Sequence, residues 1–277
     1  MADQIEHIGE STVQHGPEND RVYVMHGDAT DTELAGRVAD LREEHGYSKI
    51  FAKIPAALFG SFRELGCQIE AFIPGYFRGE ADALLVSAFF DEARRRPSET
   101  ETSNLDIVFS SPPRDLVFDP DVRVEVLSSE EAAEIAHVFT QVFETYPFPI
   151  HDPAYIRETM ETHIVYFGIR DEGRLVGVSS AEKDTKAECV EMTDFAVLPE
   201  TQGKRYASYL LRAMEERMRE EGLHVAYTIA RALSIGMNKT FYHARYRFSG
   251  MLVNNTNISG GRESMNVWYK PLRPELT

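Results

Sequence analysis

Residues 191–222, EMTDFAVLPETQGKRYASYLLRAMEERMREEG, decide the fold of this chain. The segment begins as an apolar strand that ends at Leu198, continues as the short loop PETQGKRYA, and becomes a helix. In that helix apolar side chains recur at helical spacing, and Gly222 marks its end. A strand that turns directly into a helix leaves the first N–H groups of the helix unpaired. The loop therefore predicts a receptor for a polyanion such as a pyrophosphate.

The loop resembles a known signature. Residues 202–207, QGKRYA, align with [Q/R]-x-x-G-x-[G/A], the acyl-CoA-binding signature of the GCN5-related N-acetyltransferases. This resemblance implies acetyl-CoA as cosubstrate, held by Phe195, Val197, Gln202, Gly203, Lys204, Arg205, Ala207 and Ser208. Arg205 departs from the signature, because its place normally holds a glycine that lets the backbone approach phosphate. A side chain there must point away or wrap the phosphate itself.

Short glycine motifs also match ordinary strand-to-helix connections by chance, so the surrounding elements decide between the two interpretations. Upstream, a helix is predicted from Ser128 onward. Strands are predicted at residues 164–169, 175–179, 189–197 and 224–230, then a helix running into a strand at 234–252 and a last strand at 265–272. This is the element order of the acetyltransferase fold. The fold class predicted is α/β, with a mixed, mostly antiparallel sheet flanked by helices.

The polar stretch RRRPSETETSN, residues 94–104, predicts a domain boundary. We expect a smaller N-terminal α/β domain at 1–104, a linker with a short strand (LDIVF) at 105–121, and the catalytic domain at 122–277. Residues 47–90 predict strand, helix, strand, strand, the order that also follows the cofactor helix. The N-terminal domain is either a degenerate half-copy of the acetyltransferase fold, without a recognisable active site, or a common α/β layering without shared descent.

The composition of the chain argues against some classes of binding partner. The 277 residues include 29 Lys and Arg against 45 Asp and Glu, a net charge of −16, which argues against a nucleic-acid partner and favours cationic ligands. We find neither a charged leader nor an apolar run long enough to span a bilayer, so we expect a cytoplasmic protein without a membrane partner. Cys67 and Cys189 lie in apolar segments and are expected to be reduced core thiols. No metal site is predicted.

Acetyl transfer to an amine needs a base, because a lysine-like ammonium has a pKa of about 10.4 and only the neutral nitrogen attacks. Glu191 is the first candidate and Asp194 its rival; either could instead be a strand carboxylate paired with a surface base. In a regular strand the two would point to opposite faces. The family has a bulge on this strand, which would let both contribute.

The resemblance also implies groups for the thioester. A backbone N–H near Phe195 or Val197 would stabilise the developing negative charge on its oxygen. Tyr242 is the candidate acid for the departing thiolate, although it stands one residue late in the family's tyrosine pattern. A packed or half-exposed aromatic is the alternative for Tyr242, because one residue turns a helix side chain by about 100°.

Two further segments predict the acceptor site. The resemblance implies that residues 145–156, TYPFPIHDPAYI, form a loop over the acceptor amine, and we expect Tyr146 and Phe148 to close over its methylene groups. Residues 254–272 carry amides between the last two strands. The predicted carboxylate donors are Asn254, Asn255 and Arg231, whereas Glu191, Asp194 and Asp152 are predicted to face ammonium groups.

Together these segments resemble the β-lysine N6-acetyltransferases, which make the compatible solute Nε-acetyl-β-lysine from β-lysine and acetyl-CoA. The resemblance implies a small amino-acid substrate and a functional link to a lysine 2,3-aminomutase; a homodimer is compatible with the sequence. Three alternatives stay open. The chain could acetylate another small amine or a peptide amine, it could be a non-catalytic regulator that binds acyl-CoA, or it could be a structural or interaction protein.

Overall fold

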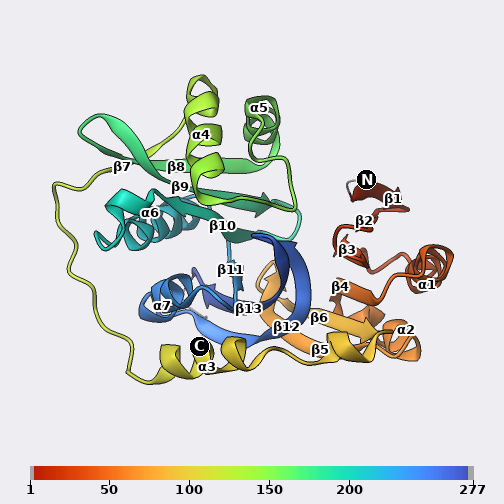
Figure 1. The fold of residues 1–277 in the computed structure, drawn as a ribbon. Helices are drawn as coiled ribbons and strands as arrows, with labels where there is room; N and C mark the ends of the chain where they lie inside the picture. Colours follow the sequence, from red (N-terminus) through yellow and green to blue (C-terminus); the bar gives the residue numbers. More distant parts are fainter. Residues whose placement is uncertain (1–2, 274–277) are drawn as a thin grey trace.

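A computed structural model describes residues 3–273, which form two sheets with helices against them (Figure 1). The N-terminal elements are β1 (Gln4–Ile8), β2 (Ser11–Gly16), β3 (Arg21–His26), α1 (Leu34–His45), β4 (Lys49–Pro55), α2 (Phe59–Glu64), β5 (Gln68–Phe77), β6 (Ala81–Phe89) and α3 (Glu99–Phe109). In the described chain this sheet has the order β1-β2-β3-β4-β6-β5. Its apolar side chains, such as Val22, Val24 and Ile50, pack against α1 and α2.

The C-terminal elements are β7 (Val124–Val126), α4 (Ala132–Val142), α5 (Pro153–Thr162), β8 (Ile164–Asp171), β9 (Arg174–Asp184), β10 (Cys189–Val197), α6 (Tyr206–Glu220), β11 (Val225–Arg231), α7 (Ile235–His243), β12 (Arg247–Ile258) and β13 (Gly261–Pro271). The sheet order is β12-β13-β11-β10-β9-β8-β7, with β10 and β11 parallel and the other neighbours antiparallel. This confirms the predicted fold class. None of the helices between residues 3 and 273 is long and apolar enough to cross a bilayer.

The two sheets share one plan. Apart from β7, which precedes the shared part of the C-terminal sheet, each has an antiparallel meander, β1-β2-β3 or β8-β9-β10, and continues through a helix to a parallel strand, β4 or β11. Each ends with an antiparallel pair, β5-β6 or β12-β13. In each pair the later strand lies between the earlier strand and the parallel strand, β4 or β11. The repeat expected from residues 47–90 therefore also includes β1 to β3 and α1. The counterpart of the cofactor loop, residues 27–33, carries three acids and no base, which disfavours a second phosphate site.

The predicted domain boundary is an ordered segment. Ser98 and Glu101 form a capping box at the start of α3, and Glu101, 3% exposed, also accepts the Ser264 N–H at 2.6 Å. The prediction of a short strand in LDIVF is wrong, because these residues continue α3 to Phe109. The polar composition of 94–104 reflects helix capping. The limits 1–104, 105–121 and 122–277 stay a prediction, and α3 crosses the first of them.

The sheets meet through the equivalent strands β5 and β12. Ser249 Oγ accepts the Phe72 N–H at 2.8 Å and donates to the Phe72 carbonyl. Gly250 permits the approach, because a Cβ there would lie 2.0 Å from the Glu70 carbonyl oxygen. Buried side chains of both sheets share one core cluster that includes Phe51, Ile73, Tyr76, Tyr227, Val267 and Tyr269. The two sheets therefore pack as one body with a fixed geometry.

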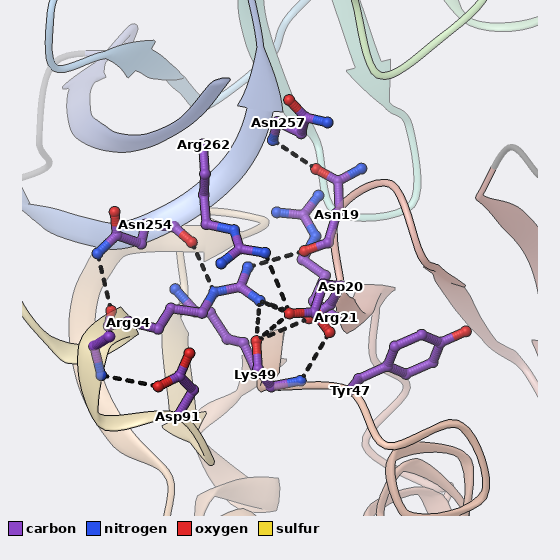
Figure 2. A network of polar contacts seen from close by, with 12 residues as sticks. Asn19, Asp20, Arg21, Tyr47, Lys49, Asp91, Arg94, Asn254, Asn257 and Arg262 are labelled. Carbon is purple, nitrogen blue, oxygen red and sulfur yellow. Dashed lines mark hydrogen bonds and ion pairs between the residues drawn. The ribbon is translucent and has the colours of Figure 1, made fainter. Parts of the chain in front are cut away.

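A buried arginine also joins the N-terminal sheet to the β12–β13 hairpin (Figure 2). Arg94 is 2% exposed and donates Nε to the Asn254 carbonyl and Nη2 to the Asn19 carbonyl, both at 3.0 Å. The Asn254 amide donates back to the carbonyls of Arg94 and Arg96 at 3.0 and 2.9 Å. Burial lowers the pKa of Arg94 to about 9, so it stays charged at neutral pH. The hairpin is thus held against the N-terminal sheet.

Candidate active site

Two cavities meet at the end of β10. The larger, about 970 Å³, lies between the two sheets, and the smaller, about 590 Å³, lies beside the start of α6. Both are lined by Tyr146, Thr193, Asp194, Ile229, Ile258 and Met265. Molecules bound in the two cavities would therefore approach each other at this junction.

The smaller cavity contains the predicted cofactor loop. Gln202, Gly203, Arg205 and Ala207 line it together with Phe195 and Val197 of β10. Arg205 provides no side-chain cap at the start of α6, so the N–H groups of Tyr206 and Ala207 are available to an anion. The structure thus brings these six predicted residues together around one cavity.

Arg205 shows how the chain accommodates the missing glycine. Its φ of +60° is left-handed, a conformation that glycine adopts at lower cost. The side chain leaves the loop and donates Nη2 to the Val117 carbonyl at 3.2 Å. Of the two conformations expected for this side chain, the structure thus shows the one that points away from the loop. Lys204 and Ser208 do not line the cavity, and the Lys204 ammonium pairs with Asp171 at 2.5 Å.

A bulge in β10 turns Asp194 into both cavities. The β9–β10 register shifts between Thr193 and Ala196, and Asp194 has a φ of +52°. Its Oδ2 accepts the Ser180 hydroxyl at 2.5 Å, and its Oδ1 accepts the hydroxyl of Tyr146. Burial raises the pKa of Asp194, while these hydroxyls oppose the shift. Asp194 is thus held firmly and its oxygens are already occupied by donors.

Glu191 precedes Asp194 by three residues on β10 and lines the larger cavity. It pairs in register with Glu182 on β9 and Tyr227 on β11. Burial, followed by the neighbouring charge of Glu182, raises the pKa of Glu191 to about 7, and Lys53 opposes this shift. A carboxylate with such a pKa can accept a proton at neutral pH. The bulge lets Glu191 and Asp194 line the same cavity, as the family's bulge had suggested.

The predicted acceptor residues separate into two groups. Tyr146, Phe148 and Asn255 line the larger cavity, and Asn255 is 2% exposed with no partner for its Oδ1. Asn254 points instead toward Arg94 and lines neither cavity. Arg231 lines the smaller cavity, where Glu263 neutralises it through contacts of 2.9 and 2.6 Å. The structure thus leaves only Asn255 of the three predicted carboxylate donors in the larger cavity.

Two further predicted residues lie outside both cavities. The ring of Tyr242 packs against Phe109 and Trp268, with centroids 5.4 and 6.2 Å away. Asp152 caps α5 by accepting the Ala154 N–H at 2.8 Å. The segment 145–156 is thus only partly the loop we expected, because α5 begins at Pro153. The described geometry gives the assignment of Tyr242 as acid no support.

Sequence analysis missed the N-terminal wall of the larger cavity. Arg21 and Tyr23 on β3 and Phe51 and Lys53 on β4 line it, together with Tyr76 on β5. Successive side chains of a strand point to opposite faces, so the alternation in RVYVMH and KIFAKIP was the available signal. The N-terminal domain, in which the sequence shows no recognisable active site of its own, therefore supplies one wall of this cavity. No group of three or more His, Cys, Asp or Glu side chains within residues 3–273 could hold a metal ion.

Known proteins place the chain in a family. The profile of the acetyltransferase (GNAT) family matches residues 132–237. The chain is 39% identical over 273 residues to the beta-lysine N(6)-acetyltransferase of Methanococcus maripaludis, across 97% of this chain and 98% of that one. The chain belongs to the GNAT family. It is also 35% identical to the N-acetyltransferase YodP of Bacillus subtilis, across 73% of this chain and 74% of that protein.

Solved structures match about half of the chain. The ribosomal-protein-S18-alanine N-acetyltransferase of Escherichia coli has 13% identity and a TM-score of 0.49, over 56% of this chain and 98% of its own. A spermidine/spermine N-acetyltransferase of Vibrio cholerae has 16% identity and a TM-score of 0.48, over 56% and 95%. The family assignment rests on the sequence relatives.

Proposed function

We propose that the protein transfers the acetyl group of acetyl-CoA to N6 of β-lysine. The observation that carries this proposal is the junction of two cavities at the β10 bulge, with Glu191 in the wall of the larger one. The relative from Methanococcus maripaludis, matched over nearly its whole length, supports the choice of acceptor.

The smaller cavity suits acetyl-CoA. Backbone N–H groups of the loop and of the first turn of α6 would bind the pyrophosphate, helped by the positive end of the helix dipole. The thioester would then lie toward the junction, where the bulge interrupts the β9–β10 ladder near Phe195. An N–H freed by the bulge would stabilise negative charge on the thioester oxygen.

The larger cavity suits an amine acceptor. Glu191 takes one proton from the N6 ammonium, and the neutral nitrogen then attacks the thioester carbonyl carbon. The new C–N bond forms, the C–S bond breaks, the nitrogen loses its second proton, and the departing CoA sulfur takes up a proton. Asp194 holds the Tyr146 hydroxyl at the junction and so orients the wall on which the two substrates meet.

A thiol-release assay with a panel of amines tests the proposal. β-Lysine should give the highest kcat/KM, above lysine, spermidine and a peptide amine. A higher value for another amine would replace the acceptor but keep the enzyme class. Binding of acetyl-CoA without release of CoA by any amine would instead favour the non-catalytic regulator.

The role in the cell forms a further part of this proposal. We infer that the product serves as a compatible solute, that a lysine 2,3-aminomutase supplies β-lysine, and that the reaction takes place in the cytoplasm. The net charge of −16 suits a salt-rich medium. A strain lacking the protein should accumulate β-lysine and lose its acetylated form at high salt. Unchanged levels of both compounds would contradict this role. A homodimer stays a prediction that sedimentation can test.

A further inference from the structure

A buried arginine on the N-terminal wall makes no ion pair with the residues that the structure describes. Arg21 is 3% exposed and lines the larger cavity. Its Nη1 donates to the Asn255 carbonyl and, at 3.3 Å, to the Thr256 hydroxyl. Its Nε is buried without a partner, and Arg21 makes no ion pair with any residue in the part of the chain described. A buried charge is normally paired, so this guanidinium has capacity for an anion.

The guanidinium is held in a fixed position. It lies over the ring of Tyr23, with 4.8 Å to the centroid, and 5.7 Å from that of Phe51. Burial lowers the pKa of Arg21 to about 10, so the group is still a cation at neutral pH. A fixed planar donor of this kind matches the two oxygens of a carboxylate.

Cations from the N-terminal sheet and carboxylates from the catalytic sheet both line the cavity. Arg21 and Lys53 come from the N-terminal sheet, and the Lys53 amine donates to the Tyr227 hydroxyl at 2.9 Å. Glu182 and Glu191 come from β9 and β10 of the catalytic sheet. The arrangement fits a ligand with a carboxylate at one end and ammonium groups at the other, and about 970 Å³ is ample for a diamino acid.

We propose that Arg21 binds the carboxylate of the acceptor, so that the N-terminal domain selects amino acids over plain diamines. The inference rests on the proposed function, because it takes β-lysine as the acceptor. The carboxylate lies at Arg21 and the N6 amine reaches the junction beside Glu191. Arg21 thereby takes the role that sequence analysis assigned to Asn254, Asn255 and Arg231. Asn255 contributes by accepting the Nη1 hydrogen bond and so orienting the guanidinium.

The test compares two acceptors that differ only in the carboxylate. 1,4-Diaminopentane is β-lysine without that group, and the unmutated protein should prefer β-lysine by about tenfold or more in kcat/KM. Arg21→Gln should lower kcat/KM for β-lysine between about tenfold and a hundredfold, mainly through KM, and leave the diamine nearly unchanged. Arg21→Lys keeps the charge and should fall between the two. Equal losses on both acceptors, or a diamine preference in the unmutated protein, would overturn the inference.

Controls separate this result from misfolding and from failure of the proposed function. Arg21 does not line the smaller cavity, so Arg21→Gln should keep the rise in melting temperature that acetyl-CoA causes. Arg262→Gln is the matched control, because Arg262 pairs with Asp20 at 3.2 Å and lines neither cavity. It should leave the ratio of the two acceptors unchanged. If the unmutated protein does not acetylate β-lysine, the proposed function fails; if it does so without distinguishing the diamine, only the role of Arg21 fails.

Discussion

Replacing Glu191 by Gln tests the proposed base. The substitution keeps the size of the side chain but removes the group that accepts the proton, so kcat should fall by about a hundredfold or more at neutral pH. Binding of acetyl-CoA should persist, because Glu191 lines the larger cavity and not the smaller one. CoA release measures the first quantity and a thermal-shift titration the second.

The pH profile gives the sharper readout. Since the pKa of Glu191 is raised to about 7, kcat/KM of the unmutated protein should rise about tenfold per pH unit below pH 7 and then level off. Glu191→Gln should lose this plateau. Its rate should keep rising toward pH 10, because the fraction of free amine in the substrate then sets it.

The same raised pKa predicts a gain in stability from Glu191→Gln. The folded-state pKa lies above the unfolded value, so the Glu191 contribution to stability is present at about pH 4 and lost as the pH rises through about 7. The variant should therefore match the unmutated protein near pH 4 and melt at a higher temperature at pH 8. A variant that keeps the plateau near pH 7 would refute the reasoning. If Asp194→Asn lost the plateau instead, the two carboxylates would exchange roles.

Three further substitutions test the cofactor loop, the domain contact and the acid. Lys204→Ala should weaken acetyl-CoA binding only modestly in a thermal-shift titration, because Asp171 already holds the ammonium; a loss above about tenfold would contradict this. Gly250→Ala should lower the free energy of unfolding by at least about 2 kcal/mol in urea, since its Cβ would lie 2.0 Å from the Glu70 carbonyl oxygen; unchanged stability would contradict the close approach. Tyr242→Phe should keep kcat within about twofold, because the ring lies outside both cavities, and a large loss would restore Tyr242 as the acid.

Local patterns predicted the catalytic half of the fold well. The strand at 189–197 coincides with β10, and the helix that follows the loop is α6. Both depend on periodicities within one short segment, which a sequence displays directly. The loop residues consequently lie together at the smaller cavity, with only Lys204 and Ser208 outside its lining.

Long-range contacts explain what the sequence did not reveal. The larger cavity exists because β5 and β12, far apart in the sequence, pack side by side, and no local pattern encodes that pairing. β1 was missed because its side chains are half-buried or exposed and give no apolar alternation. The polar residues at 94–104 indicated a linker, whereas two of them, Ser98 and Glu101, form the capping box that begins α3.

Two adjacent asparagines show most clearly why a sequence pattern does not determine which side chain reaches a cavity. Asn254 and Asn255 look equivalent in the sequence, yet Asn254 binds the Arg94 and Arg96 carbonyls and Asn255 lines the larger cavity. The β12–β13 register shifts between Leu252 and Thr256, so the simple alternation of a strand does not hold there. Only the three-dimensional pairing determines which amide lies in the cavity wall.

A crystal structure of the protein with CoA and β-lysine together would test the central claim most directly. We predict CoA in the smaller cavity and β-lysine in the larger one, with N6 at the junction beside Glu191 and the carboxylate on Arg21. β-Lysine bound outside the space between the two sheets, or bound with its carboxylate at the junction and N6 toward Arg21, would contradict the account.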